Sequence, residues 1–155
     1  MKWWNGTITK LKPNMVFVYG SNPEGRHGLG AAKLALRYGA KYGVGRGLMG
    51  QTYALVTKNL KAGFVEKLPD GREIRYPTEG PCSVGLDQIR ENIVELYECA
   101  REHPDKMFIV VQKADGHGLN GYSPLELWKG FTSFIEVPDN IYFHNSFKRY
   151  KDVPA

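Results

Sequence analysis

Two short, wholly apolar runs constrain the fold of this chain more than any other feature. They are residues 15–19 (MVFVY) and 107–111 (MFIVV). A strand that is buried on one face alternates apolar and polar residues, whereas a strand covered on both faces is continuously apolar. Each run therefore predicts a strand in the interior of a sheet that has helices packed on both faces.

The rest of the chain alternates further strand and helix patterns. Strands are predicted at 3–9, 52–57 and 140–143, with a hairpin at 64–76 that turns at 69–71. Apolar residues at helical spacing predict helices at 31–38, 83–103 and 124–134. This alternation predicts a three-layer α/β/α fold with a mixed, mostly parallel central sheet. The length of 155 residues fits one domain that spans residues 1–155.

Composition and charge narrow the class of protein. No apolar run approaches the ~20 residues of a membrane span, and the first residues lack the apolar segment of a signal peptide. We therefore expect a cytoplasmic protein without a membrane partner. The formal net charge of +5 favours anionic partners, nucleic acid among them. A solvated basic surface would explain the same charge.

The cysteines do not predict a disulfide framework or a metal site. Cys82 and Cys99 form no Cys-x-x-Cys pair, so we expect both to be buried free thiols. His103 follows Cys99 by four residues, but a zinc site needs three or four convergent ligands. Neither a metal nor another cofactor is predicted.

Three glycine-rich loops, at 20–30, 39–50 and 115–122, are the main candidates for a ligand site. The first and third directly follow the two apolar strands, and ligands of parallel sheets bind at the carboxyl ends of strands. The middle loop contains G-x-G-x-x-G at 45–50, but between a helix and a strand, the reverse of a dinucleotide fingerprint. We interpret that loop as mobile.

The first loop combines glycines with an arginine and a histidine. Glycines allow backbone N–H groups to approach a ligand closely, and a helix N-terminus adds unpaired donors. Because Ala31 and Ala32 follow Gly30, the loop is not a Walker A motif. Tight packing of the helix on the sheet is the alternative explanation. A diphosphate suits such a loop, and the residues predicted to bind a ligand here are Ser21, Asn22, Gly28, Leu29, Gly30 and Ala31.

The third loop and the strand at 52–57 bring further chemistry to the same edge. Asp115, His117 and Asn120 offer acid–base and hydrogen-bonding groups, and Lys58 directly follows its strand. A simple turn, in which Asp and Asn bond the backbone, and an exposed surface lysine are the alternatives. The predicted ligand-binding residues of this loop are Gly116, His117, Gly118, Leu119, Gly121 and, as a stacking ring, Tyr122. The three tryptophans, Trp3, Trp4 and Trp128, are expected in or beside the core.

The order of these motifs resembles the macro-domain family, whose members bind ADP-ribose. Residues 6–9 (GTIT) resemble its Gly-Asp-Ile-Thr strand start, and residues 16–22 resemble its apolar strand ending in Ala-Asn. Residues 25–33 are similar to its first ligand loop and helix. Residues 111–122 are similar to its second loop, with Gly-x-Gly-hydrophobic-x-Gly. The resemblance covers roughly residues 4–143 and implies an ADP-ribose site.

Within that family the chain most resembles a divergent branch, the ADP-ribosyl-glutamate hydrolases and ADP-ribose-1″-phosphate phosphatases. Their third strand reads much like residues 53–58 (YALVTK), which implies that Lys58 is catalytic. Thr7 stands where the family usually has the Asp that holds the adenine amino group, and Asn120 stands where the hydrolases have a catalytic Asp. Small proteins of this kind are common in tailed bacteriophages, which implies a location in the host cytoplasm.

Three functional hypotheses follow. In the first, the chain binds ADP-ribose or an ADP-ribosylated macromolecule and hydrolyses ADP-ribosyl linkages or ADP-ribose-1″-phosphate. Asn22 then bonds the distal ribose, and the candidate catalytic residues are Lys58, His27, Asp115 and Asn120. In the second, it is a non-catalytic reader or scavenger of ADP-ribose or a related NAD-derived nucleotide, because the amide of Asn120 cannot take a proton. In the third, it is a basic nucleic-acid-binding module.

Overall fold

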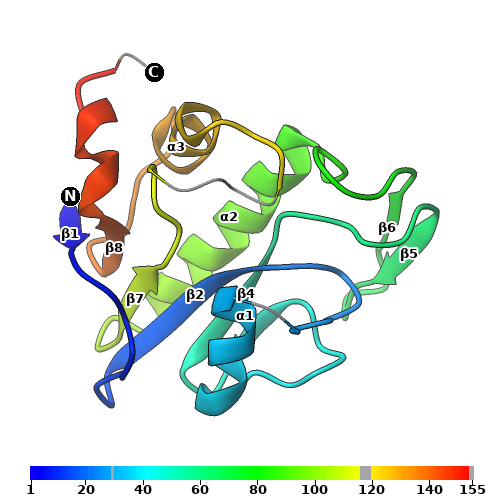
Figure 1. The fold of residues 1–155 in the computed structure, drawn as a ribbon, viewed down its shortest axis with the longest axis horizontal. Coiled ribbons are helices and arrows are strands. Elements are labelled where there is room, and N and C mark those ends of the chain that lie inside the picture. Colours follow the sequence, from blue (N-terminus) through cyan, green and yellow to red (C-terminus); the bar gives the residue numbers. More distant parts are fainter. Residues whose placement is uncertain (29, 116–119, 154–155) are drawn as a thin grey trace.

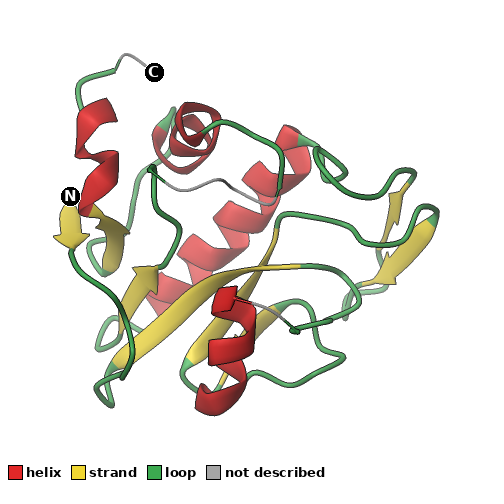
Figure 2. Cartoon of the chain, viewed as in Figure 1, coloured by secondary structure: helices red, strands yellow, loops and turns green. Residues whose placement is uncertain are grey.

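A six-stranded sheet forms the centre of the computed structural model, which describes residues 1–28, 30–115 and 120–153 (Figures 1 and 2). Its strands run in the order β1-β8-β7-β2-β4-β3, and all neighbours are parallel except β3 and β4. The strands are β1 (Lys2–Trp4), β2 (Met15–Ser21), β3 (Gly47–Met49), β4 (Thr52–Val56), β7 (Met107–Val110) and β8 (Ile141–His144). The mixed, mostly parallel sheet that was predicted is confirmed.

Helices cover both faces of this sheet, so the fold has the three α/β/α layers that were predicted. The short helix α1 (Gly30–Ala35) and the 3-10 turn η1 (Leu36–Tyr38) lie on one face. Helices α2 (Leu86–Glu102) and α3 (Pro124–Thr132) lie on the other, and η2 (Asn145–Tyr150) packs beside α3 (Figure 1). The hairpin of β5 (Phe64–Lys67) and β6 (Glu73–Tyr76) projects from the side remote from β1 (Figure 2).

The apolar run at 15–19 is explained by this double cover. Successive side chains of a strand point to opposite faces of the sheet. Val16 and Val18 pack in the core with α2 and α3, whereas Phe17 and Tyr19 pack in the core on the α1 face. A strand with two buried faces has no position left for a polar side chain.

Local signals explain where the helices begin and end. At the start of α3, Ser123 and Glu126 form a capping box, and Pro124 takes the first helical position. The helix predicted at 31–38 ends as an α-helix at Ala35 and continues as a 3-10 turn. Gly39, with φ of +113°, then reverses the chain. The α-helical part, α1, is therefore only six residues long.

Several sequence-based expectations were wrong. The first strand ends at Trp4, since Gly6 has φ of +88° and turns the chain out of the sheet. The loop at 39–50 is not a simple mobile loop, because residues 47–49 form edge strand β3 against β4. Cys82 is exposed, because it lies in the turn before α2 with φ of +57°, and Cys99 is half-buried. Both thiols are free, as expected.

The tryptophans lie where they were expected. Trp128 is buried, and Trp3 and Trp4 are half-buried. Trp3 stacks on Trp128 with a centroid separation of 5.8 Å, and the indole N–H of Trp4 donates to the carbonyl oxygen of Val110 over 2.8 Å. These rings therefore tie β1 and α3 to the sheet.

Candidate functional site

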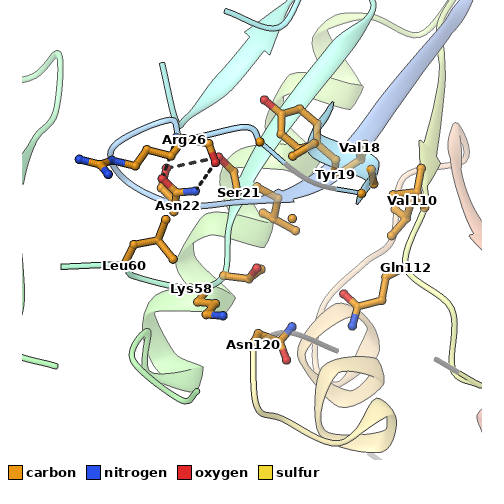
Figure 3. Close-up of a pocket in the computed structure, with 18 of the residues that line it drawn as sticks. Val18, Tyr19, Ser21, Asn22, Arg26, Lys58, Leu60, Val110, Gln112 and Asn120 are labelled. Carbon is orange, nitrogen blue, oxygen red and sulfur yellow. Dashed lines mark hydrogen bonds between the residues drawn. The ribbon is translucent and has the colours of Figure 1, made fainter. Parts of the chain in front are cut away.

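A cavity of about 590 Å³ opens at the carboxyl ends of β2, β4 and β7 (Figure 3). This is the edge at which parallel sheets hold their ligands. Its described lining includes seven residues that the sequence analysis selected, namely Ser21, Asn22, Gly28, Gly30, Ala31, Lys58 and Asn120. Segments far apart in the chain thus meet in one cavity. The predicted residues Leu29, Gly116, His117, Gly118 and Leu119 lie outside the described part of the chain.

Asn22 closes the loop that follows β2. Its Oδ1 accepts the backbone N–H of Arg26 over 3.0 Å, and its Nδ2 donates to the carbonyl oxygen of Arg26 over 3.0 Å (Figure 3). The guanidinium of Arg26 is largely exposed and lies 3.4 Å from the carboxylate of Glu24. Asn22, expected to bond a ribose, therefore also holds Arg26 at the wall of the cavity.

His27 lies behind the cavity wall. Its side chain is 1% exposed and is not part of the described lining. Nε2 lies 3.2 Å from the hydroxyl of Tyr19 and 3.3 Å from that of Ser21, two residues that do line the cavity. Burial lowers the pKa of His27, because desolvation disfavours the charged imidazolium. Its geometry suits a residue that positions the wall rather than the proton-transfer group that the sequence predicted.

Lys58 follows β4 on a backbone that is held from three sides. The N–H groups of Thr57 and Lys58 donate to the carbonyl oxygen of Ser21 over 3.0 and 3.4 Å. On one side, Asn92 of α2 donates to the carbonyl oxygen of Val56, the last residue of β4, over 2.9 Å. On the other, the N–H of Asn59 donates to the Ser83 hydroxyl over 2.7 Å. Lys58 is thus a half-buried cation on a well-fixed strand end.

At the end of the third loop, Asn120 and Tyr122 lie in different surroundings. Asn120 lines the cavity, although its Oδ1 also accepts the backbone N–H of Tyr122 over 3.0 Å. Between them, Gly121 has φ of +89° and packs on Pro81 and Cys82, so closely that a Cβ would clash. This turn directs Tyr122 to the segment just before α2, where its hydroxyl donates to the carbonyl oxygen of Val84. Tyr122 is therefore not brought to the cavity as a stacking ring, and neither Gly121 nor the exposed Asp115 is part of the described lining.

The loop at 39–50 packs directly on the loop at 22–28. The N–H of Gly43 donates to the carbonyl oxygen of Gly25 over 2.9 Å. A Cβ on Gly25 would strike the backbone of Val44, and one on Gly45 would strike the backbone of Asn22. Gly45, the first glycine of the G-x-G-x-x-G motif, therefore allows the backbones of the two loops to approach closely.

The cavity is cationic and contains residues that the sequence analysis did not select. Arg26, Lys58 and Lys113 line it, and none of its described lining residues is a carboxylate. Lys113 lies with Nζ 5.9 Å from the ring centroid of Trp4. Gln112 and Lys113 follow directly after a predicted buried strand, which was a usable signal, whereas Tyr42 and Leu60 reach the cavity only through the tertiary fold.

No group of three or more His, Cys, Asp or Glu side chains among the described residues is arranged to hold a metal ion. None of the described helices combines the length and hydrophobicity that crossing a bilayer requires. Comparisons with family models, with curated proteins and with solved structures find no significant match to this chain.

Proposed function

We propose that the cavity binds ADP-ribose, free or attached to a macromolecule. The observation that carries this proposal is the meeting of three cations with the glycine loop at the carboxyl ends of parallel strands, without a carboxylate in the described lining. A diphosphate carries two negative charges and suits such a surface. The volume of about 590 Å³ lies within the roughly 300–1,000 Å³ of small-molecule sites.

The lining residues divide naturally between the parts of this ligand. Gly28 and Gly30 expose backbone to the cavity, where the diphosphate lies between Arg26 and Lys58. Gln112 and Lys113, which follow β7, contact the adenosine half. Thr7 is exposed and outside the described lining, so the adenine amino group is held without it.

We further propose that Lys58 makes the site hydrolytic. Its ammonium group donates a proton to the departing oxygen while water adds to the anomeric carbon of the distal ribose, and the proton that the water loses passes to the Lys58 amine. The bond from that carbon to the departing oxygen breaks, and free ADP-ribose is the product. Lys58 supports this role better than His27 or Asp115, because neither of those is part of the described lining.

A non-catalytic reader is the second candidate function. Asn120 lines the cavity, and its amide can hydrogen-bond a ribose hydroxyl but cannot remove the proton. A site that binds ADP-ribose tightly without a general base holds its ligand instead of consuming it. The two candidates share the ligand and differ only in turnover.

Isothermal titration calorimetry with ADP-ribose, ADP and NAD tests the shared proposal. We expect ADP-ribose to bind at least tenfold more tightly than NAD, a difference of about 1.4 kcal/mol, because NAD carries a positively charged ring on the distal ribose, close to Lys58. Absence of ADP-ribose binding would overturn both candidates. Release of ADP-ribose from a modified substrate over time then separates a hydrolase from a reader.

A further inference from the structure

Two large apolar side chains stand exposed at the mouth of the cavity. Tyr42 is 66% exposed and Leu60 is 38% exposed, and both belong to the cavity lining. Each has an exposed lysine as its neighbour in the chain, Lys41 before Tyr42 and Lys61 after Leu60. Single exposed apolar residues are ordinary, but an aromatic ring and an aliphatic side chain, each beside a cation at one opening, form a defined surface.

This surface is built on ordered backbone. Tyr42 lies inside a turn closed by the N–H of Val44 on the carbonyl oxygen of Lys41, over 3.1 Å. On the other side, the fully buried Asn59 donates from Nδ2 to the carbonyl oxygen of Lys61 over 2.8 Å. A ligand that binds here therefore meets side chains whose loops are already held in place, which lowers the entropy cost of binding.

The positive charge of the protein is concentrated in the first 61 residues, which include every residue of this surface. The first 61 residues contain ten Lys and Arg residues and one carboxylate, Glu24, whereas the remaining residues contain eleven and fifteen. Lys33, Arg37 and Lys41 are exposed at four-residue spacing along α1, η1 and the following turn, and lead to Tyr42. An asymmetry of this size indicates a polyanionic partner.

We propose that this rim, defined as Arg26, Lys41, Tyr42, Leu60 and Lys61, binds single-stranded nucleic acid. A base stacks on the ring of Tyr42 against Leu60, and the flanking phosphates lie on the three cations. Aromatic platforms within basic grooves are the means by which proteins hold single strands without reading their sequence. In a duplex the bases are stacked on one another, so only the phosphates would be in reach. The proposal goes beyond ADP-ribose binding and does not depend on it.

Fluorescence anisotropy with a labelled oligothymidylate of about 12 nucleotides tests the proposal on the full chain. We expect saturable binding whose log affinity falls linearly with log salt. Tyr42→Ala should weaken binding roughly 5- to 150-fold, the range for loss of one stacked base, and Tyr42→Phe should restore it. Lys41→Glu/Lys61→Glu should weaken binding and reduce the salt slope by about 0.7 for each phosphate that is no longer neutralised.

Lys67→Glu/Lys129→Glu is the matched control, because it changes the net charge equally at two exposed lysines, in β5 and α3. We expect it to leave affinity for the strand within about twofold. Equal losses in both double variants, unaltered binding by Tyr42→Ala, or stronger binding of a duplex or an acidic peptide than of the strand would each overturn the proposal. Calorimetry of Lys41→Glu/Lys61→Glu with ADP-ribose shows separately whether the cavity still binds its own ligand.

Discussion

The side-chain amide of Asn22 is bonded at both ends to the backbone of Arg26, through Oδ1 to the N–H and through Nδ2 to the carbonyl oxygen. This pair closes the loop that leaves β2 and fixes the backbone of a cationic residue at the wall of the cavity. Asn22, which the sequence predicted to contact the ligand directly, thus also shapes the site by positioning Arg26.

Asn22→Ala should therefore lower both stability and affinity. It removes two hydrogen bonds, each with a net contribution of about 1 kcal/mol, and frees Arg26 to move. Asn22→Asp should have a smaller effect on the loop, because the carboxylate still accepts from the N–H of Arg26 but cannot donate to its carbonyl oxygen. Urea denaturation and calorimetry with ADP-ribose measure the two effects. Equal stability of all three proteins would show that the loop does not depend on this pair.

Gly45→Ala and Gly28→Ala should separate folding from binding. The Cβ that Gly45→Ala adds would strike the backbone of Asn22, so we expect a loss of about 2 kcal/mol or more in the free energy of unfolding. Gly28 lines the cavity and has open space at its Cβ position. Its substitution should leave the thermal midpoint nearly unchanged and weaken ADP-ribose binding. The reverse pattern would contradict the assignment of the two loops.

Arg46 should be a large contributor to stability. It pairs with Glu66 through two hydrogen bonds, of 2.7 and 2.9 Å, and also bonds Asn92 and Glu95. Arg46→Ala leaves the buried carboxylate of Glu66 with Tyr76 alone among these partners, which should cost about 3–5 kcal/mol. The exposed pair of Arg72 and Asp70 is the control. Arg72→Ala should hardly move the urea midpoint.

Burial of His27 should make the fold sensitive to acid. Its pKa is lowered in the folded state by desolvation, so the unfolded chain takes a proton first as the pH falls below about 6.5. The contribution of the neutral histidine to the free energy of unfolding is present in full well above that pH and is lost below it. The loss is at most about 1.4 kcal/mol per histidine at about pH 5.5. His27→Gln should flatten the pH dependence of the urea midpoint. Part of the slope should remain, because burial also lowers the pKa of His144. An unchanged slope would exclude His27 as its source.

Lys58→Ala should abolish release of ADP-ribose and leave affinity for ADP-ribose within a few-fold. The proposed proton donor is lost, whereas Arg26 still offsets the charge of the diphosphate. The measurement is the rate of ADP-ribose release at saturating substrate, with circular dichroism to show that the variant is folded. Lys58→Arg keeps the charge but donates a proton poorly, so it should bind well and remain inactive. Full activity of Lys58→Ala would overturn the role of Lys58.

The sequence alone predicted those features of the fold that depend on one local pattern. The continuous apolar runs predicted the central strands β2 and β7, because only a strand covered on both faces excludes polar residues. The alternation of strands and helices predicted the layers, and the carboxyl ends of those strands predicted the edge at which Ser21, Asn22, Lys58 and Asn120 meet.

Tertiary contacts between distant segments determined the features that the sequence did not predict, namely the edge strand and the positions of several side chains around the cavity. Edge strand β3 exists because β4 offers it a partner, and three residues are too few to show a periodicity. His27 lies behind the cavity wall, and Tyr122 turns toward the segment before α2, because of hydrogen bonds that no local pattern encodes. Tyr42 and Leu60 share one opening only because two loops, separated by the whole of β3 and β4, end at the same edge. Local sequence specifies which way a segment folds, but the neighbours of a side chain come from the packing of the entire chain.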